Sequence, residues 1–535
     1  MRSAPRELVL DDDDGPGSSG LPAAPGPGLR WAPPGRAHAV RRTWLDTFDW
    51  RLYRAGLILQ QATAGGATEI TLTSADGSEL ARPLQARVRW PALATALPPG
   101  PLRSRLAEVA GVRALLPVAR AVSSVSEQRV VNADDKTVAY VRLDRMPAAE
   151  GRPAVLLTVS PLRGYQRQAD RVARALGANG VIRCSRPAAA ALERALAAAG
   201  RRPASYTGKI EVVLDPGMPA VAAVAAILTA LLDIVEANVP GTLRDLDTEF
   251  LHDLRVAVRR SRTMVKLAGD VLPCGMTGRF GEDLRWLGSL TTPVRDLDVY
   301  LLGFDEMAGR LVAADPADLE PFRDRLALRR AAERKRLVSG LRSARFSRFV
   351  AEWRAALAAA PAAPPAPAAL PAPAGPAGPP GPAAGRLAAA RISRAHRRVL
   401  RDGAALTGDS PPQDLHDLRK RCKELRYLLE MFASLYDPAG HRRVLRDLRK
   451  LQDCLGEFQD SQVQREEIGT LAGQMMASRS VPAATLLAMG EVAATVAARQ
   501  ARARAEFAAA FAAFASPASR SRLRALVAAS GGAAA

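Results

Sequence analysis

The sequence contains few aromatic residues and few cysteines. Phe, Trp and Tyr together make up 5% of the 535 residues, which disfavours a surface built to stack the bases of single-stranded nucleic acid. The cysteines, at positions 184, 274, 422 and 454, are far apart and form no CxxC pair. They therefore predict neither a disulfide framework nor a structural zinc site, and they fit a reducing cytoplasm, where we expect the protein to be located.

No apolar run is long enough to predict a membrane span. The longest charge-free run before the proline-rich segment, from Pro216 to Leu232, has 17 residues and contains Pro219. A span needs roughly 20 apolar residues, so we expect a buried helix here. The N-terminus has no apolar segment behind a basic start, and no signal peptide is predicted.

Positive charge is in excess. Lys and Arg number 75 against 54 Asp and Glu, which gives a formal net charge of +21. Such an excess indicates an anionic partner but says nothing about the fold. Arg far outnumbers Lys, and guanidinium groups suit phosphate oxygens because they can donate two hydrogen bonds at once. The Arg-, Ala- and Pro-rich composition also suggests a bacterium with a GC-rich genome.

The chain divides into a mixed part and a helical part. Residues 1–36, rich in Asp, Pro and Gly, are predicted to be disordered. Residues 37–215 combine strand-like runs with helical stretches, whereas residues 219–530 show apolar residues at helical spacing. The predicted strands include EITLTS (69–74), KTVAYVRLD (136–144) and PAVLLTVS (153–160), and the predicted helices of the mixed part lie around 102–110 and 166–176.

The helical part contains one unit twice. Leu251-His-Asp-Leu-Arg255 recurs as Leu415-His-Asp-Leu-Arg419, and the same offset of 164 residues relates Asp296 to Asp460. We interpret this constant offset as a tandem duplication. An Ala-, Pro- and Gly-rich spacer at 360–385 separates the units, 219–358 and 386–530. Each unit is expected to form four helices and to relate to the other by a pseudo-twofold axis: 219–238, 247–270, 278–303 and 316–358, then 386–403, 412–435, 440–473 and 484–530.

A line of basic residues follows the repeated helix of each unit. In the first unit its members, spaced by 3, 4, 3 and 4 residues, share one face beside an apolar seam. Neighbouring like charges repel, so such a line is unfavourable without a counter-charge, which a linear polyanion would supply. The second unit repeats the first four positions and then ends in Glu430. The members are His252, Arg255, Arg259, Arg262 and Lys266, then His416, Arg419, Lys423 and Arg426.

A solvated face balanced by acids is the alternative interpretation of each line. The two histidines would then be surface or capping residues without a ligand. Four nearby aspartates are expected to be cap or salt-bridge residues rather than metal ligands. They are Asp253, Asp296, Asp417 and Asp460.

The helical part resembles the CHAD domain, the histidine-bearing α-helical domain. The resemblance covers about 220–530 and rests on LHDLRVAVRRSRTMVKL, LRWLGSLTTPVRDLDVYL, LHDLRKRCKELRYLLEMF and LRDLRKLQDCLGEFQD. It implies a helical domain whose basic groove binds inorganic polyphosphate and can associate with polyphosphate granules. By this matching, the basic lines hold the binding candidates, and Arg285, Arg446 and Arg449 are weaker ones.

The mixed part is similar to the CYTH, or triphosphate tunnel, family. The similarity rests on TWLDTFDWRLYRAGLILQ (43–60), EQRVVNADDKTVAYVRLDRM (127–146) and VLLTVSPLRGYQRQADRVARAL (155–176). It implies an antiparallel β-tunnel in which basic residues hold a triphosphate and paired glutamates hold a divalent metal, whose ligands are oxygen atoms. The glutamate motif is not found, since Glu7 stands alone and LLTVS carries no acid. We therefore expect a degenerate CYTH-like domain at 37–215 with no catalytic residue, metal or cofactor.

The expected whole is an α+β multidomain protein that binds inorganic polyphosphate rather than acting as an enzyme. Two alternatives stay open. One is non-specific nucleic-acid binding, which phosphate contacts alone would permit. The other is an active CYTH-type triphosphatase, which metal-dependent phosphate release would establish.

Overall fold

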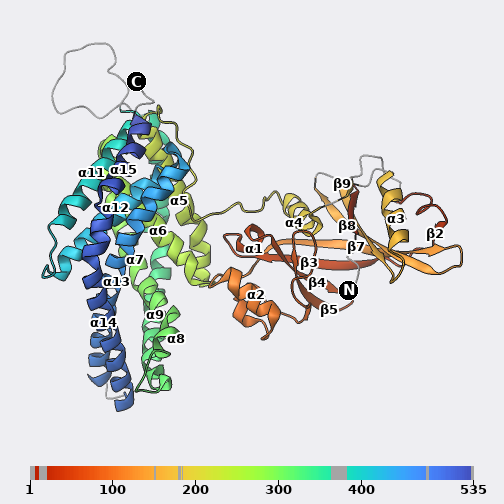
Figure 1. The fold of residues 1–535 in the computed structure, drawn as a ribbon, viewed down its shortest axis with the longest axis horizontal. Helices are drawn as coiled ribbons and strands as arrows, with labels where there is room; N and C mark the ends of the chain where they lie inside the picture. The colour runs from red at the N-terminus through yellow and green to blue at the C-terminus, as the bar shows by residue number, and fades with distance from the viewer. Residues whose placement is uncertain are drawn as a thin grey trace, which may run out of the picture. The chain divides into compact units, whose positions relative to one another are not determined.

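The computed structural model describes residues 6–10, 21–149, 152–178, 182–183, 185–362, 382–477 and 481–531 (Figure 1). It forms two compact units, which divide between Gly208 and Lys209. An antiparallel β-sheet dominates the first unit, and α-helices form the second. The α+β multidomain fold predicted from the sequence is confirmed.

The first unit is built on one sheet. Its elements are β1 (Arg6–Leu10), β2 (Leu29–Trp31), β3 (His38–Asp46), α1 (Arg51–Arg54), β4 (Leu57–Ala64), β5 (Ala67–Ser74), β6 (Leu84–Gln85), α2 (Pro101–Ala110), β7 (Leu116–Asn132), β8 (Thr137–Ala149), β9 (Arg152–Pro161), α3 (Gln166–Ala178), β10 (Ile182–Arg183) and α4 (Pro187–Ala197). The strands are hydrogen-bonded in the order β10-β1-β9-β8-β7-β3-β4-β5-β6, and β2 pairs with β7. The three predicted strands and two predicted helices are confirmed as β5, β8, β9, α2 and α3. An antiparallel sheet also fits the tunnel-like domain that the resemblance implied.

Alternating side chains give the sheet an apolar face. Leu157 and Val159 of β9 are buried against Val172 and Leu176 of α3. Successive strand residues point to opposite faces, so the apolar residues at every second position form this layer. The other face carries polar residues, which are described with the site below.

The prediction that residues 1–36 are disordered is wrong for two segments. Residues of β1 pair with β9, from Arg6 opposite Val159 to Leu10 opposite Val155. Leu29 of β2 is buried against β7, and Trp31 Nε1 donates a hydrogen bond to the carbonyl of Pro22 at 2.8 Å. Backbone pairing with the longer strands β9 and β7 thus places both short segments in the sheet. The aspartates at 11–14 lie outside the described residues.

The second unit consists of two sets of helices. The first half (residues 209–362) holds α5 (Ala220–Arg244), α6 (Thr248–Ala268), α7 (Met276–Leu302), α8 (Phe304–Ala308), α9 (Glu320–Leu341) and α10 (Ala344–Ala359). The second half (residues 382–531) holds α11 (Ala384–Ala404), α12 (Pro412–Met431), α13 (Pro438–Ala477), α14 (Ala483–Phe514) and α15 (Pro517–Gly531). Corresponding helices begin at matching places: 384 − 220 and 412 − 248 both give 164, the offset of the sequence motifs.

The fourth predicted helix of each half is broken in two. A serine stands at each break, and its hydroxyl accepts the backbone N–H three residues on, as in an N-cap. Ser343 accepts from Phe346 at 3.3 Å before α10, and Ser516 accepts from Ser519 at 3.3 Å before α15. The continuous helices predicted at 316–358 and 484–530 are therefore corrected to the pairs α9–α10 and α14–α15.

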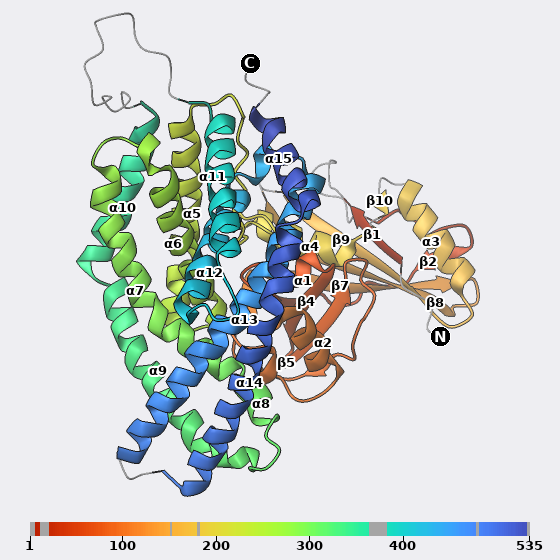
Figure 2. The same cartoon turned by 60° about the vertical axis from the view of Figure 1, so that its left-hand side comes forward.

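One apolar core joins the two halves. Leu228, Leu254 and Trp353 of the first half belong to the same buried cluster as Leu418 and Leu448 of the second. A separate cluster packs Phe304 and Phe322 of the first half with Ile468 and Met489 of the second. It lies toward the end of the long α13–α14 pair, near which the ribbon shows α8 and α9 (Figure 2). The predicted spacer is shorter than 360–385, because Ala360 and Ala384 are buried in the core, and residues 363–381 lie outside the described ones.

Helix α5 is apolar enough and long enough to cross a membrane by those two criteria alone. Of its most apolar window, 56% is buried inside the protein. Ile227, Leu228 and Leu231 are fully covered by neighbouring helices. The expectation of a buried helix after Pro216 is confirmed.

Candidate functional site

Helices α6 and α12 carry the two predicted basic lines. Asp247 caps α6, where its carboxylate accepts the N–H groups of Glu249 at 2.9 Å and Phe250 at 3.2 Å. The apolar face of each helix packs into the core, where Leu254 of α6 and Leu418 of α12 are buried. The basic residues one position further round therefore lie at the edge of the core. We call their combined set the basic strip: His252, Arg255, Arg259 and Arg262 of α6 with His416, Arg419, Lys423 and Arg426 of α12.

Equivalent residues of the two halves face one another in the strip. Lys423 interacts electrostatically with Arg259, its own equivalent, since 423 − 259 is 164. Asp296 of α7 interacts in the same way with Asp460 of α13, and 460 − 296 is also 164. Residues that meet their own equivalents lie near the axis that relates the halves. The two basic lines are thus brought together into one surface.

The same ion pair occurs in each half. Arg255 Nη1 lies 3.1 Å from Asp296 Oδ1, and Arg419 Nη2 lies 2.8 Å from Asp460 Oδ1. Asp417 pairs with Lys420 at 3.0 Å. The expectation that these aspartates form salt bridges is confirmed. Both Asp296 and Asp460 have more than half of their side chains exposed, at 57% and 68%, so each pair restrains an arginine rather than stabilising the fold strongly.

Arg259 differs from the other arginines at the centre of the strip. It is half-buried, and its guanidinium carbon lies 5.4 Å from the ring centroid of Tyr427. Its Nε is buried without a hydrogen-bond partner, and among the described residues no carboxylate lies within ion-pair distance. Burial, followed by the charges of Arg255 and Arg426, lowers its pKa. The centre of the strip therefore holds a cation that the protein itself does not neutralise.

Two further basic groups in the strip have pKa values below their ordinary ones, which favours their uncharged forms. Burial, followed by the neighbouring arginines Arg419 and Arg259, lowers the pKa of Lys423 to about 7. Burial and the charge of Arg295 lower the pKa of His252, although Glu249 partly offsets this. An anion bound at the strip would favour the protonated form of both groups.

The weaker candidates flank the strip on α7 and α13. Arg262 lies over Gly288, where an added Cβ would come within 3.0 Å of its Nη1, and Arg426 donates to Gln452 Oε1 at 3.3 Å. Residues 288 and 452 are equivalent, as are Arg285 and Arg449, which lie one turn before them and are exposed. Arg446 is also exposed and lies one turn before Arg449 in α13.

Lys266 and the undetected Arg260 connect the halves instead. The ammonium of Lys266 pairs with Glu424 at 2.5 Å, and Arg260 Nη2 lies 2.6 Å from Glu430 Oε2. Sequence analysis placed Lys266 at the end of the first line and did not single out Arg260, which is off that line. A signal was present, because the offset of 164 pairs Arg260 with Glu424 and Lys266 with Glu430, both of opposite charge.

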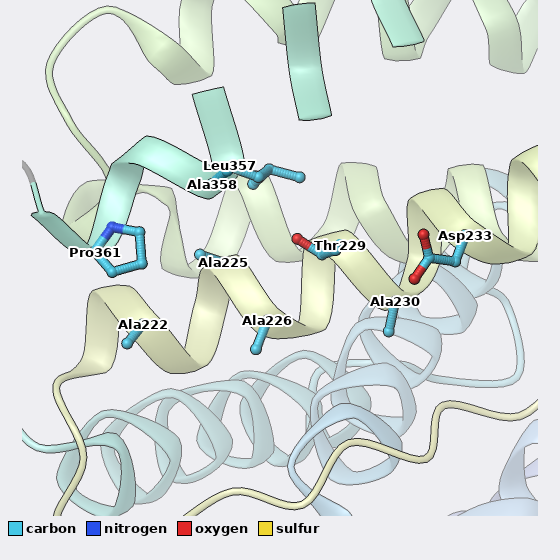
Figure 3. A pocket seen from close by; sticks show the side chains of 9 residues that line it. All are labelled: Ala222, Ala225, Ala226, Thr229, Ala230, Asp233, Leu357, Ala358 and Pro361. Atoms are coloured by element: carbon cyan, nitrogen blue, oxygen red, sulfur yellow. The ribbon is translucent and has the colours of Figure 1, made fainter. Parts of the chain in front are cut away.

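A hollow between α5 and α10 does not fit an anion. Its volume is about 370 Å³, and small side chains of α5 form one wall (Figure 3). Asp233 is its charged lining residue, and Arg354 of α10 binds that carboxylate from outside the lining. The full lining is Ala222, Ala225, Ala226, Thr229, Ala230, Asp233, Leu357, Ala358 and Pro361.

A buried arginine of the first unit is neutralised within its sheet. Arg42 is 8% exposed, forms an ion pair with Asp144 and donates from Nε to Ser123 Oγ at 3.1 Å. Asp46, in the segment similar to the CYTH family, accepts one backbone N–H group from the turn before α1 and two from α1 itself, and burial raises its pKa to about 6. That carboxylate therefore has a structural role. In the described part of the chain, no three His, Cys, Asp or Glu side chains gather where they could hold a metal ion.

Comparisons with known proteins concern the second unit. Residues 226–469, from α5 into α13, match the model of the CHAD domain family. The crystal structure of the CHAD domain from the plant Ricinus communis is 26% identical with a TM-score of 0.47, over 57% of this chain and 95% of that one. PptA from Streptomyces chartreusis is 18% identical with a TM-score of 0.40, over 55% of this chain and 99% of that one. The comparison with curated proteins gives no match.

Proposed function

We propose that the chain binds inorganic polyphosphate along the basic strip, and the match of residues 226–469 to the CHAD domain family supports this. The observation that carries the proposal is the facing pair of Arg259 and Lys423. Arg259 has no carboxylate within ion-pair distance among the described residues, and burial together with cationic neighbours lowers the pKa of Lys423. Phosphoryl oxygens along a chain would satisfy both groups.

The arrangement of the strip favours a polyphosphate chain over other polyanions. The candidates from residue 252 to 262 span ten residues of α6, or about 15 Å at the helical rise, which suits a ligand with repeated charges. An inorganic polyphosphate chain is also identical in both directions, which matches a site built from two similar halves. A nucleic-acid strand, by contrast, has different 5′ and 3′ directions. Base-stacking groups are scarce here, because Tyr427 is 1% exposed.

Charge reversal at the facing pair tests the assignment. The Arg259→Glu/Lys423→Glu variant should lose about 100-fold in affinity for long-chain polyphosphate, because two charge-assisted contacts are replaced by repulsion. Isothermal titration measures the loss, and circular dichroism checks that the helices remain.

Arg325→Glu/Arg336→Glu on α9 is the matched control, since both arginines are exposed and the change in net charge is the same. An equal loss in the control would reduce the effect to bulk charge and contradict the site. Displacement of polyphosphate by DNA at the same phosphate concentration would favour the nucleic-acid alternative instead.

We also propose that the protein acts in the cytoplasm, on polyphosphate granules. A fluorescent fusion should co-localise with stained granules, and the Arg259→Glu/Lys423→Glu fusion should be diffuse. Co-localisation of both fusions would show that the strip does not direct the protein to granules.

A further inference from the structure

Three guanidinium groups surround one aromatic ring beneath the strip. The guanidinium carbons of Arg259, Arg426 and Arg260 lie 5.4, 5.6 and 5.9 Å from the ring centroid of Tyr427. Each cation gains from the face of the ring, but three like charges this close also repel one another. The cluster requires negative charge nearby.

Glu430 supplies one negative charge to two of the three arginines. Its Oε2 lies 2.6 Å from Arg260 Nη2, and its Oε1 lies 3.3 Å from Arg426 Nε. One of these arginines comes from each half, so the carboxylate joins α6 to α12. The side chain of Glu430 is 21% exposed, and that of Arg426 is 32% exposed. Both side chains are therefore partly accessible to solvent and to a ligand.

Glu430 occupies a position that is basic in the first half. The residue 164 places earlier is Lys266, the last cation of the first basic line. The second line runs through Lys423 and Arg426 and then meets this carboxylate. Arg426 Nε is buried without a hydrogen bond, so Glu430 acts on this guanidinium through its charge, and a phosphoryl group would compete with the carboxylate for the same cation.

We propose that Glu430 is an internal counter-anion of the basic strip, which occupies Arg426 in the free protein and weakens and limits the binding of polyphosphate there. The inference rests on the proposed function. Glu430 does not contact the ligand and acts through Arg426, so it lowers affinity by competing with the ligand for that guanidinium.

Glu430→Gln tests this directly, because glutamine keeps the size of the side chain and removes its charge. The variant should bind long-chain polyphosphate about ten-fold more tightly, which is the gain from one released charge-assisted contact. The slope of log affinity against log salt should become steeper by about one, since one more phosphate is neutralised by protein. Both quantities come from titrations of the full chain at three salt concentrations.

Asp402→Asn is the matched control. Asp402 is also a carboxylate shared by two arginines, Arg401 at 2.7 Å and Arg421 at 3.4 Å, but neither arginine belongs to the strip. The substitution changes net charge by the same amount. Affinity should change less than about two-fold, because long-range charge is screened at physiological salt. Equal gains in both variants would overturn the proposal.

A second comparison separates competition from the joining of the halves. Arg260→Gln/Glu430→Gln keeps the wild-type net charge, removes the bridge and leaves Arg426 free. It should bind polyphosphate about ten-fold more tightly than Arg260→Gln, in which Glu430 still holds Arg426. Thermal melting accompanies each titration. No gain over Arg260→Gln would overturn the role of Glu430, whereas no binding by the wild-type chain would overturn the proposed function instead.

Discussion

Lys423 illustrates how single residues of the strip depend on their surroundings. Its side chain is half-buried between Arg419 and Arg259, and burial together with those charges lowers its pKa to about 7. A sizeable share of the molecules is therefore uncharged at this position near neutral pH. Bound phosphoryl groups favour the ammonium form, so they raise the pKa again. Binding and proton uptake are linked.

This linkage predicts how affinity varies with pH. Between pH 7 and the ordinary lysine value of 10.5, affinity for polyphosphate should fall as pH rises, by at most about ten-fold per pH unit from this group. Well below pH 7, Lys423 is already charged in the free protein and adds no further dependence. Titrations at pH 8 in two buffers of different ionisation enthalpy should show close to one proton taken up per molecule.

Lys423→Arg is the control for this prediction, because guanidinium stays charged throughout the range. The variant should bind without proton uptake at pH 8. Equal proton uptake by the variant and the wild type would assign the titration to another group.

At the residue scale, the sequence predicted the members of each basic line from helical spacing alone. It could not predict that Arg259 and Lys423 lie close enough to interact electrostatically, because tertiary packing brings together residues that are 164 apart in the sequence. Arg260 was missed for the same reason, since its partner Glu430 belongs to the other half. The assignment of all these residues to a ligand remains a prediction.

At the scale of elements, buried charge holds the helices of the first half together. Arg330 of α9 lies 2.5 Å from Asp298 of α7, whose side chain is 1% exposed, and it donates two hydrogen bonds to Asp245 at the end of α5. Burial raises the pKa of Asp298 above its ordinary value, and the hydrogen bond and charge of Arg330 offset only part of that rise. A buried carboxylate of this kind depends on its partner.

Arg330→Gln should reduce the free energy of unfolding by about 3–5 kcal/mol, because it leaves the carboxylate of Asp298 buried and unpaired. Urea unfolding measures the change. Arg336→Gln on the same helix removes an exposed pair with Glu333 and should cost less than about 1 kcal/mol. Similar losses in the two variants would contradict the structural role of Arg330.

Helical and strand periodicity predicted most elements, and the differences have local causes. The breaks before α10 and α15 follow serine caps, Ser343 and Ser516, which a spacing of apolar residues does not reveal. Strands β1 and β2 were missed because each is short and lies within Pro- and Gly-rich sequence. Their stability comes from pairing with β9 and β7 rather than from local propensity.

At the scale of the whole molecule, the two units differ in whether a buried or half-buried arginine is paired with a carboxylate. In the first unit, Arg42 is neutralised by Asp144 inside the sheet. In the second unit, packing of the two repeated halves brings their basic lines together. Arg259 is left there without a carboxylate among the described residues. The proposed polyphosphate site is therefore assigned to the helical unit. The sequence predicted both units, but only the three-dimensional structure shows that the two basic lines lie side by side.

The measurement that tests the central claim most directly is isothermal titration of the full chain with long-chain polyphosphate, at two salt concentrations and with DNA as competitor. The account predicts tight binding that persists at moderate salt and in excess DNA. Weak binding that disappears at the higher salt, or that DNA abolishes, would contradict it and would leave a generic basic surface.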